Sequence, residues 1–156
     1  MTIAWTPILL ALHVVSIVFW IGGVGFVTLV LLPALSFLPE ETRFAFFAEC
    51  ERRFGAQARV LILIAGASGG ALIARLHLAG ALRHGHAWGI EAMIALWVVF
   101  AVLLFVLEPL VLHKAMRRLA QTDARRVQVL LTRGHRVLLT LATLTILGGV
   151  LWVNGL

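Results

Sequence analysis

The sequence predicts an all-α integral membrane protein, a bundle of four transmembrane helices that forms a single domain over residues 1–156. Its composition points to this class, because 62% of the residues are hydrophobic and the mean hydropathy is +1.03. Both values lie far above those of soluble globular proteins. The apolar residues also gather into four windows, each with the roughly 20 residues that a helix needs to cross a bilayer. A lipid bilayer is therefore the first partner that we expect.

The four predicted spans are separated by one short loop and two longer polar segments. The spans cover about residues 6–36, 58–78, 88–112 and 136–154. We expect Pro33 to bend or end the first span, because proline removes a backbone hydrogen-bond donor. In the segment 39–59, phenylalanines recur at helical spacing among charges, and the segment 113–136 is basic and amphipathic. Each pattern predicts an amphipathic helix at the membrane interface.

The distribution of basic residues predicts the orientation. Four arginines lie between spans one and two, and seven lysines or arginines lie between spans three and four. Only Arg75 and Arg83 lie on the opposite side. By the positive-inside rule both termini face the periplasm or exterior. The same rule accounts for the net charge of +6, so we expect no nucleic-acid partner.

Histidines are the main candidates for chemistry. His13 is the only ionisable side chain between the N-terminus and Glu40, and it lies too deep in the first span to be freely solvated. At the predicted depths the histidines form an outer group (His13, His77, His84, His86) and an inner pair (His113, His135). Two histidines on neighbouring helices at one depth can supply both axial ligands of a haem iron.

Small and aromatic residues beside His13 fit this hypothesis. Trp20 follows His13 by seven residues and so shares its helix face, and Gly22 and Gly23 leave room for a macrocycle. The alternative is that these glycines, like the GASGG sequence at 66–70, are helix-packing surfaces.

Two acids are also notable. Glu108 lies inside the third span, where an acid is a functional-site candidate by default. We expect it to be either neutral or paired with His135, Arg136 or another inner arginine. We expect Glu51 to join Arg52, Arg53 and Arg59 in a surface network at the inner interface.

The first span resembles a known motif. The sequence LHVVSIVFWIGG, with Leu12, His13, Trp20, Gly22 and Gly23, is similar to the first helix of CopD-type copper-resistance membrane domains and of HemJ-type protoporphyrinogen oxidases. The HemJ resemblance implies a haem b on His13. That family also has a lysine after a tryptophan in its third helix, where this sequence has Glu91 after Trp88. The resemblance further implies a bacterial inner-membrane location.

These observations favour a haem-b-binding membrane protein that transfers electrons between the quinone pool and a partner, a possible membrane oxidoreductase. Haem b ligands are then His13 with His77 and, for a second haem, His113 with His135, while Glu108 carries protons. One alternative is a copper-handling protein, with His13 as a ligand. Another is a non-catalytic accessory subunit that packs against a larger membrane complex or forms a homo-oligomer.

Overall fold

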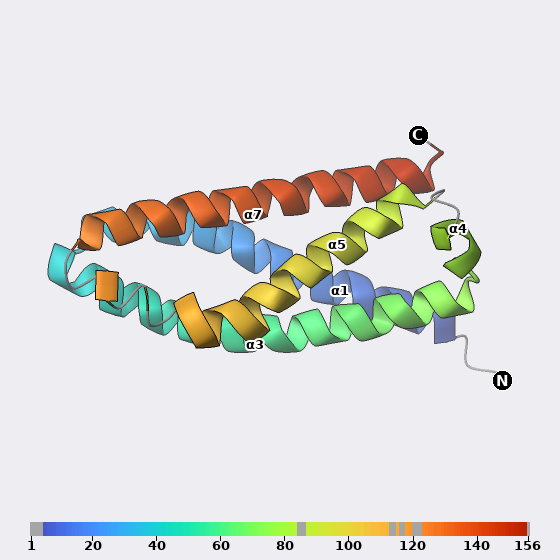
Figure 1. Cartoon of the computed structure of the whole chain (residues 1–156), viewed down its shortest axis with the longest axis horizontal. Coiled ribbons are helices and arrows are strands. Elements are labelled where there is room, and N and C mark those ends of the chain that lie inside the picture. The colour runs from blue at the N-terminus through green and yellow to red at the C-terminus, as the bar shows by residue number, and fades with distance from the viewer. Residues whose placement is uncertain (1–4, 84–86, 113–114, 116–117, 120–122, 156) are drawn as a thin grey trace.

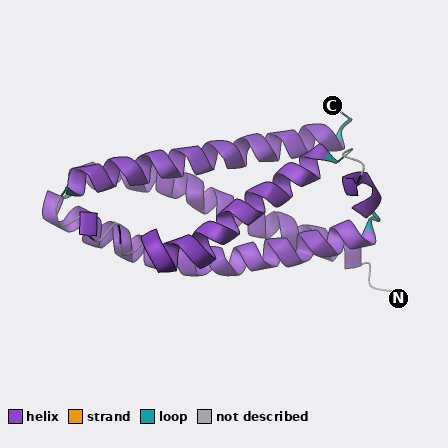
Figure 2. Cartoon of the chain, in the orientation of Figure 1, coloured by secondary structure: helices purple, strands orange, loops and turns teal. Residues whose placement is uncertain are grey.

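The computed structural model describes residues 5–83, 87–112, 115, 118–119 and 123–155. Within these residues the chain is helical almost throughout and contains no strand (Figure 2). The first helical run comprises α1 (Trp5–Phe26), the π-helical η1 (Val27–Leu31), α2 (Leu32–Ala34) and the 3₁₀-helical η2 (Leu35–Phe37). The others are α3 (Glu40–Arg75), the short α4 (Ala79–Arg83), α5 (Trp88–Val102) with the π-helical η3 (Leu103–Leu112), and α7 (Ala124–Val153).

Four of these runs are long and apolar enough to cross a membrane: Trp5–Phe37, Glu40–Arg75, Trp88–Leu110 and Arg125–Val153. They correspond to the four predicted spans, which confirms the all-α, four-span architecture of a multi-pass membrane protein. Large apolar side chains face outward along the bundle, with Leu29 68% and Leu144 60% exposed. This pattern is what a lipid-facing surface requires, because lipid tails replace water around it.

The polar segment before the second span differs from the prediction. Residues 39–59 were expected to form a separate interfacial helix, but from Glu40 onward they are continuous with the second span in the single 36-residue helix α3. No proline interrupts this helix, and Gly55 alone is too weak a breaker to end it. The described part of the other loop, from Ala124, is likewise the first part of α7, with Asp123 as its N-cap.

Two of the prolines inside the spans, Pro33 and Pro109, are accompanied by π-helical turns. Pro33 lies two residues after the last residue of η1, and Pro109 lies inside η3. A proline ring in a helix clashes with the carbonyl four residues earlier and leaves that carbonyl without its donor. A wider turn at this point accommodates both effects, and kinks at such bulges are common. Pro33 therefore loosens the first helical run, which ends at Phe37.

The helices form two close pairs. Helix α1 packs mainly along α3, and α5 mainly along α7, while α5 crosses toward α3 near its far end (Figure 1). Both chain termini lie at one end of the bundle, which we call the terminal end and define by Trp5 and Val153. The opposite end, defined by Glu40 and Arg125, is called the basic end. All four spans contribute to the central core, through Trp20, Ile62, Phe100 and Ala142.

Several glycines in the helices lie directly against a bulky side chain of a neighbour. Gly23 of α1 contacts the Phe54 ring of α3, and a Cβ atom added at Gly66 would come within 2.6 Å of the Trp97 ring of α5. The same arrangement joins α5 to α7, through Gly89 with Trp152 and Gly148 with Trp88. These glycines serve as packing surfaces, which for Gly23 and Gly66 was the alternative interpretation of their role.

Candidate functional site

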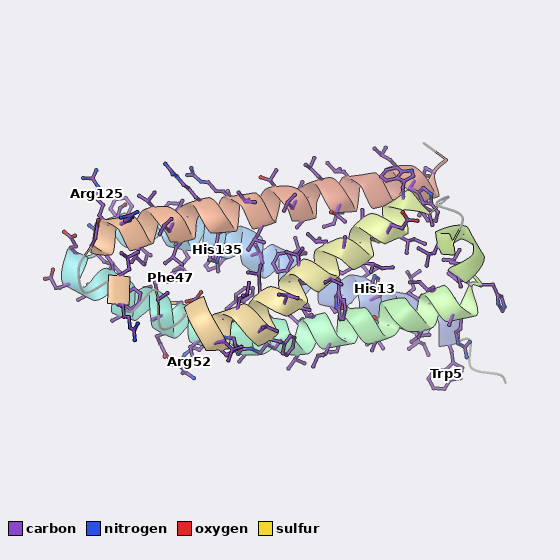
Figure 3. The ribbon with its side chains drawn as sticks, in the orientation of Figure 1. Trp5, His13, Phe47, Arg52, Arg125 and His135 are labelled. Carbon is purple, nitrogen blue, oxygen red and sulfur yellow. The ribbon has the colours of Figure 1, made fainter. Side chains whose placement is uncertain are left out.

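His13 is held by helix α3 through one nitrogen of its ring. Its Nδ1 lies 3.0 Å from the carbonyl oxygen of Ala65 and 3.2 Å from Oγ of Ser68 (Figure 3). A carbonyl can only accept a hydrogen bond, so Nδ1 carries the proton and donates. The Ser68 hydroxyl in turn donates to the carbonyl of Ile64 at 2.6 Å. The ring is thereby fixed in one tautomer.

A glycine allows the ring to approach α3 this closely. A Cβ atom added at Gly69 would lie 3.0 Å from Cε1 of His13, whereas one added at the next residue, Gly70, would meet nothing within 4 Å. On α1, the hydroxyl of Ser16 donates to the His13 carbonyl at 2.8 Å. Ser16 is buried on the same face of α1. The position of His13 therefore depends on small residues of both helices.

The second ring nitrogen, Nε2, has no hydrogen-bond partner among the residues that the structure describes. In the neutral tautomer with its proton on Nδ1, Nε2 carries a lone pair. A histidine that donates through one nitrogen to a backbone carbonyl and keeps the other for a ligand is the usual arrangement of metal-bound imidazole. Nε2 can thus coordinate a metal ion, or accept a hydrogen bond from a ligand, without rearrangement of the ring.

His77, the predicted partner of His13, has a different role in the structure. It is exposed and adopts φ of 53° immediately after α3. Its N–H donates to Ala74 and that of Leu78 to Ile73, which together form a Schellman motif at the helix end. His77 follows Gly69 by eight residues, about 12 Å at the helical rise. The structure does not bring the two histidines together.

The predicted inner pair cannot be described as a pair, because His113 lies outside the described residues, as do His84 and His86. His135 is half-buried on α7, and its Nδ1 lies 3.0 Å from the carbonyl of Leu131 in its own helix. Its ring faces the Phe47 ring of α3 edge-on, with 6.1 Å between the centroids. Among the described residues, no three His, Cys, Asp or Glu side chains gather into a group that could hold a metal ion.

The other residues of the first-span motif divide between the core and the surface. Trp20 is 3% exposed and packs edge-on against Phe100, and its indole Nε1 has no hydrogen-bond partner in the described structure. Gly23 is covered by Phe54, whereas Gly22 is exposed with no atom within 4 Å of an added Cβ. The two adjacent glycines therefore have different surroundings.

Glu108 forms an ion pair with Arg59 of α3, with 2.9 Å between Nη2 and Oε1. Arg59 also donates through Nε to the Leu104 carbonyl at 3.3 Å. Glu51, Gly55 and Arg59 are spaced four residues apart, so they share the face of α3 that meets η3. The expected partners of Glu108 were His135, Arg136 or another inner arginine. In the structure its partner is another inner arginine, Arg59.

The surroundings of Glu51 correct the prediction of a surface network. Arg52 and Arg53 both pair with Glu49, at 2.8 and 2.7 Å. Glu51 instead points toward the bundle, half-buried and near enough to Glu108 for the two carboxylates to interact. On an α-helix Glu49 and Glu51 are about 200° apart, which explains why only one of them reaches the exposed arginines.

Sequence reasoning did not identify the groups that hold His13. Ser68 was included only as part of a small-residue run, although its hydroxyl is one of the few polar side chains in that span. The carbonyl of Ala65 leaves no signal in sequence, since every residue carries one.

Comparison of the chain with family models, with curated proteins and with solved structures gives no match in any of the three.

Proposed function

We propose that the protein is a b-type cytochrome of the bacterial inner membrane, which binds haem b through His13 and transfers electrons between the quinone pool and a partner. The observation that supports this proposal is the state of the His13 ring. Its Nδ1 is anchored to Ala65 and Ser68, and its Nε2 is left without a partner. The resemblance of the first span to HemJ-type and CopD-type helices supports the same residue.

The residues fit a haem on one side only. His13 has the tautomer and fixed orientation that an axial ligand needs. His77 is an exposed helix cap. We therefore propose one haem per chain, held by His13, and assign no second ligand of the iron among the described residues. When bound, the haem iron would supply one-electron chemistry, while the chain would hold the iron and set its surroundings.

A second polar atom on this face of α1, the indole nitrogen of Trp20, is also without a partner in the described structure. Trp20 Nε1 is buried without an acceptor. It lies seven residues after His13, about 10 Å along the same face. Leaving a buried donor unpaired costs about 1–3 kcal/mol. Because Trp20 is enclosed in the core, the binding proposal rests on Nε2 of His13 and not on this atom.

We propose that Glu108 and Glu51 handle protons near the basic end. Arg59 fixes the Glu108 carboxylate, and Glu51 lies close enough to interact with it. The two carboxylates belong to neighbouring helices, α3 and η3, so each would act as a separate protonatable group of the same pathway. With the positive-inside rule, this cluster faces the cytoplasmic half of the membrane and His13 the outer half, with both termini outside.

Copper handling is the weaker alternative. Copper(I) prefers soft thiolate and thioether ligands. Cys50 lies on α3, the helix that holds His13, but 15 residues before Ala65. Met93 packs against Gly149 of α7. Neither sulfur is placed beside His13 by any contact in the described structure.

The proposal is tested by the dithionite-reduced minus air-oxidised spectrum of the purified full-length protein, expressed with ample haem. We expect α and Soret bands of haem b in the wild type and in His77→Ala, and their loss in His13→Ala. His77→Ala is the matched control because it removes an imidazole at the same end of the bundle. Wild-type protein without these bands would contradict the proposal, and bound copper in its place would favour the alternative.

A further inference from the structure

A pocket of about 390 Å³ opens at the basic end of the bundle, remote from His13. It lies between the end of the first helical run, the first turns of α3 and the first turns of α7. Its walls are mostly apolar and consist of Leu32, Leu35, Phe44, Phe47, Val127 and Leu131. Leu32, Leu35 and Phe47 belong to a buried core cluster, so the pocket extends inward from the surface to that core.

The mouth of this pocket is polar and mainly basic. Arg43 and Arg125 line it, with Glu40 as the single acid. A second pocket of about 330 Å³ adjoins it, because both are lined by Arg125 and Gln128. The second pocket adds Arg133 and Arg136 from the same face of α7. Together the two pockets present four arginines and one glutamate.

These arginines differ from three others near the same end, which form ion pairs. Arg52 and Arg53 are neutralised by Glu49, and Arg59 by Glu108. Arg43 donates to the carbonyls of Ser36 and Leu38, which fixes its guanidinium at the mouth without cancelling its charge.

In the described structure, no ion pair or hydrogen bond engages the guanidinium groups of Arg125, Arg133 and Arg136. The described structure therefore shows no ion pair that compensates the positive charge around the two pockets.

We infer that the two pockets form a binding site for an anionic phospholipid. The arginines would bind the phosphodiester and the headgroup, since a guanidinium matches phosphate oxygens in geometry and charge. The apolar walls would receive the first part of an acyl chain. Basic pockets between helices at a membrane surface recognise lipid headgroups in this way. Inorganic phosphate has no apolar part that could contact the six apolar side chains of the walls. We therefore assign the site to a lipid.

The test is native mass spectrometry of the full-length protein released from micelles that contain equal amounts of phosphatidylglycerol and phosphatidylcholine. We expect the wild type to retain the anionic lipid preferentially. Arg125→Gln should lower that retention about fivefold, because each arginine near a membrane surface contributes about that factor. Arg125 is exposed, so its replacement leaves the fold intact.

The matched control is Arg52→Gln, which removes the same charge at the same end but from a side chain paired with Glu49. It should retain the lipid as the wild type does. Equal loss in both variants, or equal retention of the two lipids by the wild type, would overturn the inference in favour of a general surface charge effect. Displacement of the lipid by millimolar inorganic phosphate would assign the site to a free anion instead.

Discussion

The surroundings of His13 and of Glu108 show two ways in which the bundle accommodates an ionisable side chain. Both groups lie at the α3 surface, Glu108 against Arg59 and His13 against Ala65 and Ser68. The Glu108 carboxylate pairs with the positive charge of Arg59, and the Leu104 carbonyl helps to orient that arginine. The His13 ring is satisfied at Nδ1 but not at Nε2. The charge of Glu108 is matched within the chain, whereas the His13 ring has an atom left for a ligand.

The difference separates stability from binding. A polar group whose hydrogen bonds and charge are all matched inside the protein contributes to the fold, and its loss should be felt as instability. A group with an unmatched atom that the fold nevertheless orients is better explained by a ligand. We therefore expect substitutions at Glu108 to change stability most, and substitutions around His13 to change haem content most.

The largest effect on stability should come from Glu108→Leu. It leaves Arg59 without its counter-charge, which costs about 3–5 kcal/mol in a fully buried pair. Because the two side chains are 23% and 34% exposed, we expect about 1–3 kcal/mol less stability, measured by denaturant titration in micelles. The double variant Arg59→Leu/Glu108→Leu should recover most of the loss. A single variant as stable as the wild type would contradict the structural role of the pair.

The next largest effect should distinguish two adjacent glycines of the first span. Gly23→Ala places a methyl group against the Phe54 ring and should cost about 1–3 kcal/mol through overpacking. Gly22→Ala meets nothing within 4 Å and should be neutral or up to about 1 kcal/mol more stable, because alanine favours helix. Thermal unfolding of the two variants measures the difference. Equal loss in both would mean that Gly22 also faces a partner.

A second pair of adjacent glycines, Gly69 and Gly70, connects packing to binding. Gly69→Ala brings a Cβ atom to 3.0 Å from Cε1 of His13 and so displaces the ring, at about 1 kcal/mol. We expect lower haem occupancy in this variant and wild-type occupancy in Gly70→Ala, whose Cβ would be free. The haem-to-protein ratio checks this. If the two variants bind haem equally, the orientation of His13 by α3 is unimportant for the ligand.

The smallest effect should come from His77→Gly. His77 holds a left-handed conformation that costs a non-glycine residue about 1 kcal/mol. Glycine should therefore raise the stability by up to about 1 kcal/mol, with haem content unchanged. Lower haem content in His77→Gly would instead restore His77 as a ligand.

Much of the fold was predictable because long apolar windows leave few alternatives in a bilayer. The four spans depend on length and hydropathy alone, and both are properties of sequence. The continuity of α3 through residues 40–59 was not predicted, since amphipathic spacing describes a helix but not whether it joins the next one. Pro33 was expected to bend or end the first span, and the π-helical turns beside it and Pro109 are how the structure absorbs the lost hydrogen bonds.

The candidate site was less predictable. His13 stood out because a single histidine among apolar residues requires an explanation. Its pairing with His77 relied on depth alone, and depth does not show that a residue caps a helix with φ of 53°. The supports of His13 are a backbone carbonyl and a serine of α3, more than 50 residues away in sequence. Such long-range contacts follow from how helices pair, which no local pattern specifies.

The central claim, that His13 Nε2 is an iron ligand, is tested most directly by chemical rescue. The cavity variant His13→Gly should lose haem b, and imidazole added during expression and purification should restore it, as measured by a pyridine haemochrome assay. Restoration by imidazole would show that the lost group is the ligand itself and not a support of the fold. A His13→Gly protein that keeps its full haem content without imidazole would contradict the account.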